Sequence, residues 1–350
     1  MEFAHDTATT ILGQLQQPTL AFLFCGMMLA ALGSRIEVPD AIYRFIVVVL
    51  LLKVGMSAGI SVREANLMKL AVPALLAALL GILIIFLGRA TLARWRGVNE
   101  VDGMATAGLF GAVSASTLAA GMAMLDDRGV AYEGFIGALY PFMDIAALVT
   151  AIVLARMSAE RKAARGLQGG GTATMTMGGS GGFDGEMVRG ILVDTARSPA
   201  ISALLLGLAI GILARPDSVY ESFYEPLFRG LLSILMLVMG IEAWQRLADL
   251  RKVAHAYVLY GLAAPFVHGA LGFGAGLIAH HLTGFSGGGV VLLAVMAASS
   301  SDISGPPTLR GALPEANPSA YVGTSTGLGT PVAILSIPLW IALAEAMIGL

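Results

Sequence analysis

The chain has 350 residues, of which 57% are hydrophobic and only 13% are charged, and its mean hydropathy is +0.80. Soluble proteins carry about 25% charged residues, so this composition predicts an all-α membrane protein that crosses the bilayer many times. The net charge of −2 and the lack of a basic block argue against nucleic-acid binding, because no positive patch for phosphate is visible.

Ten apolar runs approach the length of about 20 residues that a spanning helix needs. In chain order they cover residues 18–34, 40–60, 69–89, 102–124, 131–156, 197–214, 227–246, 253–281, 286–309 and 318–349. Between the fifth and sixth runs, residues 169–182 consist mainly of Gly, Thr, Met and Ser, a composition typical of flexible linkers. We therefore expect a first five-helix repeat over 1–157, a flexible linker over 158–196 and a second five-helix repeat over 197–350.

The distribution of Lys and Arg predicts the orientation of these helices. Basic residues near helix ends are retained on the cytoplasmic side. If the linker is cytoplasmic, most such residues share its side, and the opposite side holds only Arg63, Lys69, Arg128, Arg215 and Arg229. We therefore expect both termini to be periplasmic and the linker 158–196 to be cytoplasmic.

The two halves resemble each other at matching landmarks. Pro18-Thr-Leu-Ala opens the first half and Pro199-Ala-Ile-Ser the second, and the turns Val38-Pro-Asp40 and Arg215-Pro-Asp217 follow the first helix of each half. An odd number of helices per half makes such repeats inverted in the membrane, an arrangement that places a binding site near the midplane. The pattern predicts two inverted repeats with broken helices at the midplane.

Two polar stretches at equivalent places in the halves mark the expected breaks. Gly108–Thr117 and Ala298–Thr308 put glycines, prolines and hydroxyl groups inside apolar segments. Backbone groups cannot stay unpaired in lipid, so helix breaks at this depth are tolerated where they line a cavity. Small residues also allow close helix packing without any ligand, so packing alone is the alternative reading of each single serine.

Two aspartates, Asp144 and Asp302, lie within predicted spans, where an ionisable residue is costly unless a partner or an ion compensates it. Carboxylate, hydroxyl and carbonyl oxygens together suit a hard cation such as sodium. Two aspartates within the membrane are also the minimal equipment of an intramembrane aspartyl protease. Phosphate-binding and nucleophile-elbow motifs are absent from the sequence, which argues against ATP-driven transport and hydrolase chemistry.

Four motifs carry a resemblance to a known family. They are Gly108-Leu-Phe-Gly-Ala-Val-Ser, Ala138-Leu-Tyr-Pro-Phe-Met-Asp144, Leu227-Phe-Arg-Gly-Leu-Leu-Ser-Ile-Leu-Met236 and Ser299-Ser-Ser-Asp-Ile-Ser-Gly-Pro-Pro-Thr-Leu-Arg310. With these motifs the chain resembles SbtA-type sodium-dependent bicarbonate transporters over nearly everything outside the linker. The resemblance implies a homotrimeric symporter of the bacterial inner membrane, which takes up bicarbonate with sodium to concentrate inorganic carbon. It also implies a cytoplasmic PII-like regulatory partner, SbtB, that acts with adenine nucleotide.

Within this reading we assign ligands to residues of the two breaks. Bicarbonate is expected to bind, largely through main-chain groups, at Ser114, Ala115, Ser116, Ser301, Asp302 and Ile303. Sodium is expected at Asp144, Asp302, Thr117, Ser299 and Ser304. Sodium would neutralise the aspartates so that the anion can bind nearby. The alternatives are a sodium-coupled carrier of another small anion, such as a carboxylate or sulfate, and the more remote aspartyl protease.

Overall fold

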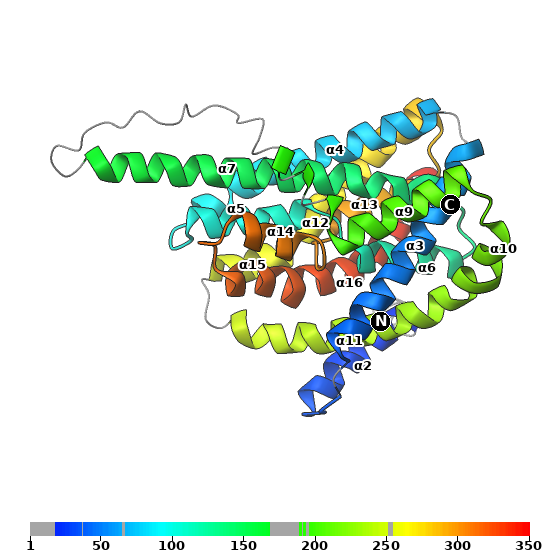
Figure 1. The fold of residues 1–350 in the computed structure, drawn as a ribbon, viewed down its shortest axis with the longest axis horizontal. Coiled ribbons are helices and arrows are strands. Elements are labelled where there is room, and N and C mark those ends of the chain that lie inside the picture. Colours follow the sequence, from blue (N-terminus) through cyan, green and yellow to red (C-terminus); the bar gives the residue numbers. More distant parts are fainter. Residues whose placement is uncertain are drawn as a thin grey trace, which may run out of the picture.

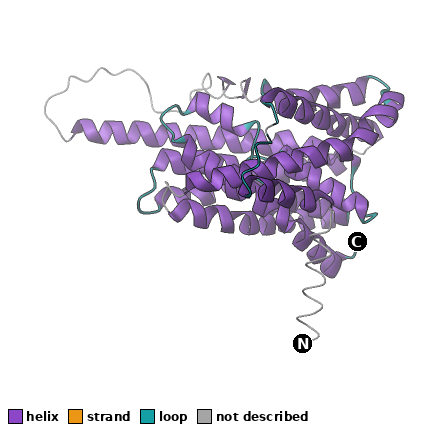
Figure 2. Cartoon of the chain, turned by 90° about the horizontal axis from the view of Figure 1, so that it is seen from below, coloured by secondary structure: helices purple, strands orange, loops and turns teal. Residues whose placement is uncertain are grey.

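The computed structural model describes residues 18–36, 38–64, 67–168, 189–190, 192–193, 196–250 and 255–350. These residues form helices joined by short connections, and no strand occurs among them (Figures 1 and 2). The predicted all-α class is therefore confirmed for the described part of the chain.

The described part of the first half contains six α-helices and two short 3₁₀ turns. They are α2 (Pro18–Ala31), α3 (Asp40–Glu64), α4 (Leu67–Ala90), η1 (Leu92–Arg94), α5 (Glu100–Gly111), α6 (Ala115–Asp127), η2 (Gly134–Leu139) and α7 (Tyr140–Gln168). Helix α7 continues past residue 157, where the linker was expected to begin. The extension 158–168 is rich in Ala, Arg, Glu and Lys, which favour helix and extend it beyond its apolar part. The Gly-rich stretch 169–182 lies outside the described residues.

The second half is also helical where the structure describes it, with two π-helical turns inserted. Its elements are α9 (Pro199–Leu213), α10 (Asp217–Val219), η3 (Tyr220–Tyr224), α11 (Glu225–Leu250), α12 (His255–Thr283), α13 (Gly287–Ala298), α14 (Gly305–Ala312), α15 (Pro318–Thr324), η4 (Ser325–Gly329) and α16 (Thr330–Ile348). Helices α2 and α9 begin at the prolines that open the two halves of the sequence. Proline suits this place because the first turn of a helix needs no N–H donor.

Seven helical stretches of the described chain are long and apolar enough to cross a membrane, by length and composition. They are Asp40–Arg63, Lys69–Arg94, Glu100–Asp127, Gly134–Ala159, Asp217–Arg246, His255–Thr283 and Pro318–Ile348. The other three predicted spans correspond to the shorter apolar helices α2, α9 and α13, of 14, 15 and 12 residues. Seven of the ten predicted spans are therefore long enough to cross a membrane. The arrangement of ten spans as two inverted repeats stays a prediction.

Glycines bring the helices of the two halves into close contact. Gly26 of α2 and Gly240 of α11 each face the backbone of the other helix, as do Gly55 of α3 and Gly207 of α9. A Cβ atom at Gly207 would lie 2.5 Å from the Leu52 carbonyl oxygen, so only glycine allows this approach. We call α2, α3, α9 and α11 the four-helix set. It consists of the first short apolar helix of each half and the membrane-length helix that follows it.

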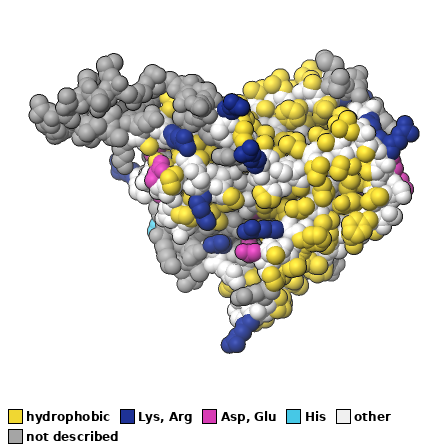
Figure 3. All heavy atoms as spheres, viewed as in Figure 1, with side chains coloured by type: hydrophobic (Ala, Val, Ile, Leu, Met, Phe, Trp, Pro, Cys, Tyr) yellow, Lys and Arg dark blue, Asp and Glu magenta, His cyan; other side chains and the backbone are white. Residues whose placement is uncertain are grey.

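The broken helices occupy the interior of the molecule. All residues of α13 after Gly287 are buried, as are those of α6 from Ala115 to Leu125. Helix α13 is apolar on all sides, as expected for a helix with no lipid-facing or water-facing side. By contrast, α4 exposes Leu75, Leu79 and Leu83 at a spacing of four residues, and hydrophobic side chains cover much of one outer face of the molecule (Figure 3).

Candidate functional site

The first helix break separates α5 from α6. Helix α5 ends at Gly111, and α6 begins at Ala115, with extended backbone at Ala112 and Ser114 between them. The Ser114 side chain caps α6 by accepting a hydrogen bond from the Thr117 N–H at 3.2 Å. Serine at this position satisfies one of the N–H groups that the first helical turn leaves without a partner. The interruption predicted at Gly108–Thr117 is therefore confirmed.

The second break separates α13 from α14. Helix α13 ends at Ala298, residues 299–304 are not helical, and α14 begins at Gly305. Pro306 and Pro307 fall in the first turn of α14, where proline is tolerated, but they could not continue α13 as a regular helix. The Gly305 N–H donates to Ser301 Oγ at 2.9 Å, so a serine of the break provides the acceptor for the first N–H group of the new helix.

Hydrogen bonds join the two breaks directly. The Ser114 N–H donates to Ser299 Oγ at 2.9 Å, and the Ser301 N–H donates to the Leu109 carbonyl at 2.8 Å. Ser116 Oγ donates to Asp302 Oδ2 at 2.8 Å. These bonds join segments that are about 190 residues apart in the sequence. The two breaks therefore meet in one largely buried cluster, as the predicted site requires.

Asp144 lies in the first turns of α7, beside both breaks. Its carboxylate accepts the Val113 N–H at 3.0 Å and the Ser304 hydroxyl at 3.3 Å. The Tyr140 hydroxyl lies within hydrogen-bond distance of the same Ser304 hydroxyl, at 3.3 Å. The Asp144 side chain is completely buried, so these donors replace the water that a carboxylate would otherwise need.

Asp302 belongs to a different hydrogen-bond group. Its Oδ2 atom accepts from Ser116, whereas its Oδ1 atom is buried and has no hydrogen-bond partner among the described residues. Ser301 and Ser304, whose hydroxyls lie 3.0 Å apart, connect this break to the Asp144 group. The two aspartates are therefore close in the fold, but each has its own set of hydroxyl partners.

The residues assigned to the anion lie together, although two of their main-chain donors are engaged. The N–H groups of Ser114 and Ser301 are bonded to Ser299 Oγ and to the Leu109 carbonyl. Ala115 and Ser116 form the buried first turn of α6, beside Asp302. Ile303 is partly buried and lines a cavity next to the break.

The residues assigned to sodium also gather around the breaks. Thr117 Oγ1 donates to Ser114 Oγ at 3.0 Å, and Ser299 Oγ donates to the Met296 carbonyl at 2.7 Å. Ser304 is bonded to Asp144. In the described part of the chain no group of three or more His, Cys, Asp and Glu could chelate a metal ion. One carboxylate with hydroxyls and carbonyls is a donor set for a hard monovalent cation rather than for a transition metal.

Sequence reasoning missed a third segment at the site, the π-helical turn η4. Ser325 Oγ lies 2.5 Å from Ser300 Oγ and donates to the Ser301 carbonyl, and Thr330 Oγ1 donates to the Ser300 carbonyl. These bonds satisfy carbonyls that the second break frees. The signal was present in the sequence as Gly323-Thr-Ser-Thr-Gly-Leu-Gly-Thr330, a hydroxyl-rich and glycine-rich run like those of the two breaks.

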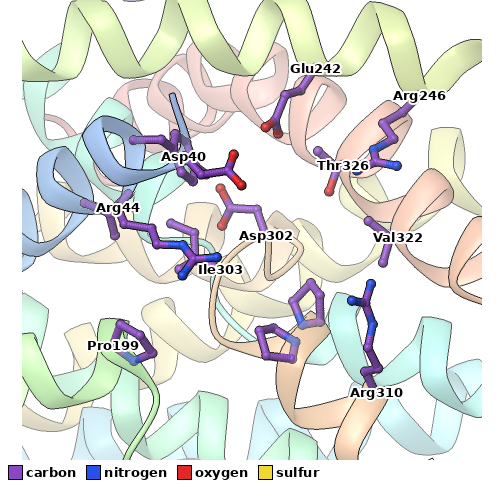
Figure 4. A pocket seen from close by; sticks show the side chains of 14 residues that line it. Asp40, Arg44, Pro199, Glu242, Arg246, Asp302, Ile303, Arg310, Val322 and Thr326 are labelled. Atoms are coloured by element: carbon purple, nitrogen blue, oxygen red, sulfur yellow. The ribbon is translucent and has the colours of Figure 1, made fainter. Parts of the chain in front are cut away.

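A cavity of about 440 Å³ lies against Asp302, and Asp144 is not among its lining residues (Figure 4). We call it the vestibule. Its charged lining residues, which sequence reasoning had not placed at the site, are Asp40, Arg44, Glu242, Arg246 and Arg310. Helix α11 directs the Glu242 carboxylate into this cavity.

Comparison with protein families assigns the chain to a class. No curated protein gave a significant match. The family model described as the Na⁺-dependent bicarbonate transporter superfamily matches residues 18–345, which is nearly the whole chain. This is a family of transporters and not of enzymes, so the aspartyl protease reading has no support. With its buried helix breaks and its membrane-length helices, the chain belongs to the Na⁺-dependent bicarbonate transporter superfamily.

Proposed function

We propose that the protein is a symporter that imports bicarbonate together with sodium across the bacterial inner membrane and thereby concentrates inorganic carbon. Family membership supports sodium-dependent bicarbonate transport. The observation that carries the proposal is the hydrogen-bonded meeting of two helix breaks in the buried interior, with one carboxylate beside each. Half-helix ends at a break attract anions through N–H groups and cations through carbonyls, so one structure serves both ions.

Bicarbonate suits the proposed anion site because it is a small monoanion that backbone N–H groups and hydroxyls can bind. We assign it to Ser114, Ala115, Ser116, Ser301, Asp302 and Ile303. In the described conformation the Ser114 and Ser301 N–H groups bond to protein acceptors. Binding through them therefore requires the two breaks to move apart slightly, with the anion replacing Ser299 Oγ and the Leu109 carbonyl as acceptor.

Sodium is assigned to Asp144, Asp302, Thr117, Ser299 and Ser304. An uncompensated carboxylate at either position would repel bicarbonate, and two unit charges about 4 Å apart interact by about 4 kcal/mol at an effective dielectric constant of about 20. Sodium removes this repulsion, so the anion binds after the cation. This order couples the sodium gradient to bicarbonate uptake.

We further propose that the halves are inverted repeats that move against each other to change access. The pairing within the four-helix set supports this architecture: α2 packs on α11 and α9 packs on α3, so the first helix of each half contacts the second long helix of the other. A two-fold axis between the halves produces this exchange. The breaks lie in the remaining helices, which would move relative to the four-helix set.

Assembly, orientation and regulation follow from the family resemblance. We propose a homotrimer with periplasmic termini, a cytoplasmic segment over 158–196 and inhibition by a PII-like partner that binds adenine nucleotide. Basic residues near the predicted helix ends support this orientation. A chemical crosslinking ladder in membranes and a cysteine-accessibility scan of both ends of the chain would test these statements.

The experiment that tests the function is uptake of radiolabelled bicarbonate into proteoliposomes with and without a sodium gradient. We expect sodium-driven uptake that unlabelled bicarbonate reduces and that formate, nitrate and sulfate leave unchanged. Competition by one of these anions would instead identify a sodium-coupled carrier of another small anion. Absence of sodium-driven uptake by the folded protein would contradict the symport proposal.

Asp144→Asn and Asp302→Asn test the role of the two carboxylates. Each change keeps the shape of the side chain but removes its charge, so we expect uptake to fall at least about tenfold, the effect of about 1.4 kcal/mol. Glu345→Gln on the exposed side of α16 is the control and should transport normally. Normal sodium affinity in both aspartate variants would refute the coupling scheme.

A further inference from the structure

A second cavity, of about 240 Å³, lies between α4 and α12, and none of the residues assigned to bicarbonate or sodium lines it. Its lining is mainly apolar and includes Leu87 of α4 and Leu259 and Val267 of α12, together with Trp95, which follows η1. Leu259, Val267 and Trp95 are also exposed on the outer surface of the molecule. Because α4 and α12 belong to membrane-length stretches, this cavity opens toward lipid. We call it the lateral groove.

Two polar atoms in the wall of the lateral groove have no hydrogen-bond partner among the described residues. They are the Tyr260 hydroxyl and His268 Nδ1, and both atoms are buried. The two rings lie edge to face with their centroids 6.0 Å apart, and His268 is only 2% exposed. A buried polar atom without a partner is costly. Both atoms therefore indicate a ligand that has hydrogen-bonding groups as well as an apolar part.

The depth of Tyr260 in the membrane identifies the polar part of this ligand. Helix α12 has 29 residues and is about 44 Å long, which matches a bilayer of about 40–45 Å with its headgroups and a hydrocarbon core of about 30 Å. Tyr260 lies about 8 Å from the start of α12 at His255, near the boundary of that core. Phospholipids have their ester carbonyls at this boundary, and a tyrosine hydroxyl and an imidazole N–H can both donate to them.

Arginines adjoin the groove-lining residues in the sequence. Arg94 and Arg96 flank Trp95, and Arg89 lies in the last turn of α4. None of the three forms an ion pair with a described residue, and residues 65–99 contain no Asp or Glu. Basic groups between or beside membrane helices bind anionic lipid headgroups, and tryptophan prefers the same interface.

The carboxylates that follow this basic stretch have other partners. Glu100 accepts a hydrogen bond from the Ser158 hydroxyl at 2.6 Å, and Asp102 accepts the Asn317 N–H at 2.8 Å. These bonds direct both carboxylates toward the end of α7 and the start of α15. The positive charge beside the groove is therefore available to an anionic headgroup.

One aromatic side chain separates the lateral groove from the first helix break. The ring centroid of Phe110 lies 5.1 Å from that of Tyr260 and 6.3 Å from that of His268. Phe110 is followed by Gly111, where α5 ends at the first break. A molecule in the groove therefore packs against the aromatic group that supports this break from behind.

We infer that the lateral groove binds an anionic phospholipid of the cytoplasmic leaflet. An acyl chain occupies its apolar part, an ester carbonyl accepts a hydrogen bond from the Tyr260 hydroxyl, and the phosphate lies beside Arg94 and Arg96. The predicted orientation places these arginines at the cytoplasmic face, where anionic lipids give the membrane surface a negative potential. The bound lipid holds α4 and α12 together behind the first break and thereby stabilises the fold.

Thermal unfolding of the purified protein in neutral detergent, with increasing mole fractions of phosphatidylglycerol or phosphatidylcholine, tests the site. We expect phosphatidylglycerol to raise the Tm at the lower mole fraction. Arg94→Gln combined with Arg96→Gln should raise the half-saturating mole fraction of phosphatidylglycerol roughly fivefold for each charge removed, and leave that of phosphatidylcholine unchanged. Tyr260→Phe should raise both values roughly two- to tenfold, because it removes a bond to the ester group that the two lipids share.

Tyr257→Phe and Arg35→Gln are the matched controls and should leave both lipid responses unchanged. The Tyr257 hydroxyl is also buried without a partner among the described residues, but Tyr257 does not line the groove. Arg35 is an exposed arginine that follows α2, on the predicted cytoplasmic side. Ala263→Trp places a large ring in the groove at an exposed lining position, so this variant should lose the response to both lipids.

Three results would each overturn the inference. They are equal half-saturation by the two lipids in the unmodified protein, a shift in Arg35→Gln as large as that in the arginine pair, and unchanged responses in both Tyr260→Phe and Ala263→Trp. The measurement needs neither sodium nor bicarbonate, so its outcome is independent of the transport proposal.

Discussion

Replacing Ser299 by alanine removes the hydroxyl that connects the two helix breaks. Ser299 Oγ accepts the Ser114 N–H at 2.9 Å and donates to the Met296 carbonyl at 2.7 Å. In Ser299→Ala the Ser114 N–H loses its acceptor in a fully buried place, while the Met296 carbonyl keeps its contact with the Ser299 N–H at 3.3 Å. The expected loss of unfolding free energy is that of one buried unsatisfied donor, about 1–3 kcal/mol.

Thermal unfolding of the purified protein measures this loss. For a chain of 350 residues, an unfolding entropy of about 2.1 cal/mol/K per residue converts this energy into a fall in Tm of about 1–4 °C. Ser233→Ala is the control, because Ser233 also donates to a helix carbonyl, that of Gly230 at 2.7 Å, but is exposed. The Gly230 carbonyl lies inside α11 and keeps the N–H donor of the helix itself, so the control should change stability by less than about 0.5 kcal/mol.

The same variant examines the assignment of Ser299 to sodium. A serine hydroxyl has one hydrogen and two lone pairs, and the two protein bonds leave one lone pair for a cation. We expect the sodium concentration for half-maximal uptake to rise in Ser299→Ala but not in Ser233→Ala. Equal Tm values for the two variants would show that the bond between the breaks contributes nothing, and the structural reasoning would then be wrong.

Two further predictions concern contacts away from the site. Gly207→Ala should destabilise the protein by about 1–3 kcal/mol, because its Cβ would lie 2.5 Å from the Leu52 carbonyl oxygen in the α3–α9 contact. Gly230→Ala has open space around its Cβ and should be neutral or slightly stabilising, so similar melting temperatures for the two variants would contradict the glycine-mediated packing. Arg229→Ala breaks a largely exposed ion pair with Asp127 and should cost less than about 1 kcal/mol with normal uptake, whereas a larger loss in denaturation experiments would refute this assessment.

Local features of the sequence were sufficient to predict the helices and their interruptions. Apolar runs identified the helical segments, and Pro18 and Pro199 mark helix starts in both sequence and structure. The breaks were predictable because Gly305-Pro306-Pro307 cannot continue a helix and because Ser114 is a good N-terminal cap. These properties depend on the backbone conformations that individual residues allow, so they can be recognised without knowledge of the fold.

The partners of the functional side chains depended on tertiary structure. The sequence grouped Asp144 and Asp302 into one sodium site, but the fold gives them different hydroxyl partners, Ser304 and Ser116. It also brings Glu242 of α11 into the vestibule beside Asp302. Hydropathy describes how apolar a segment is and not which side of a helix faces which neighbour, and that choice is made only when helices from both halves pack together.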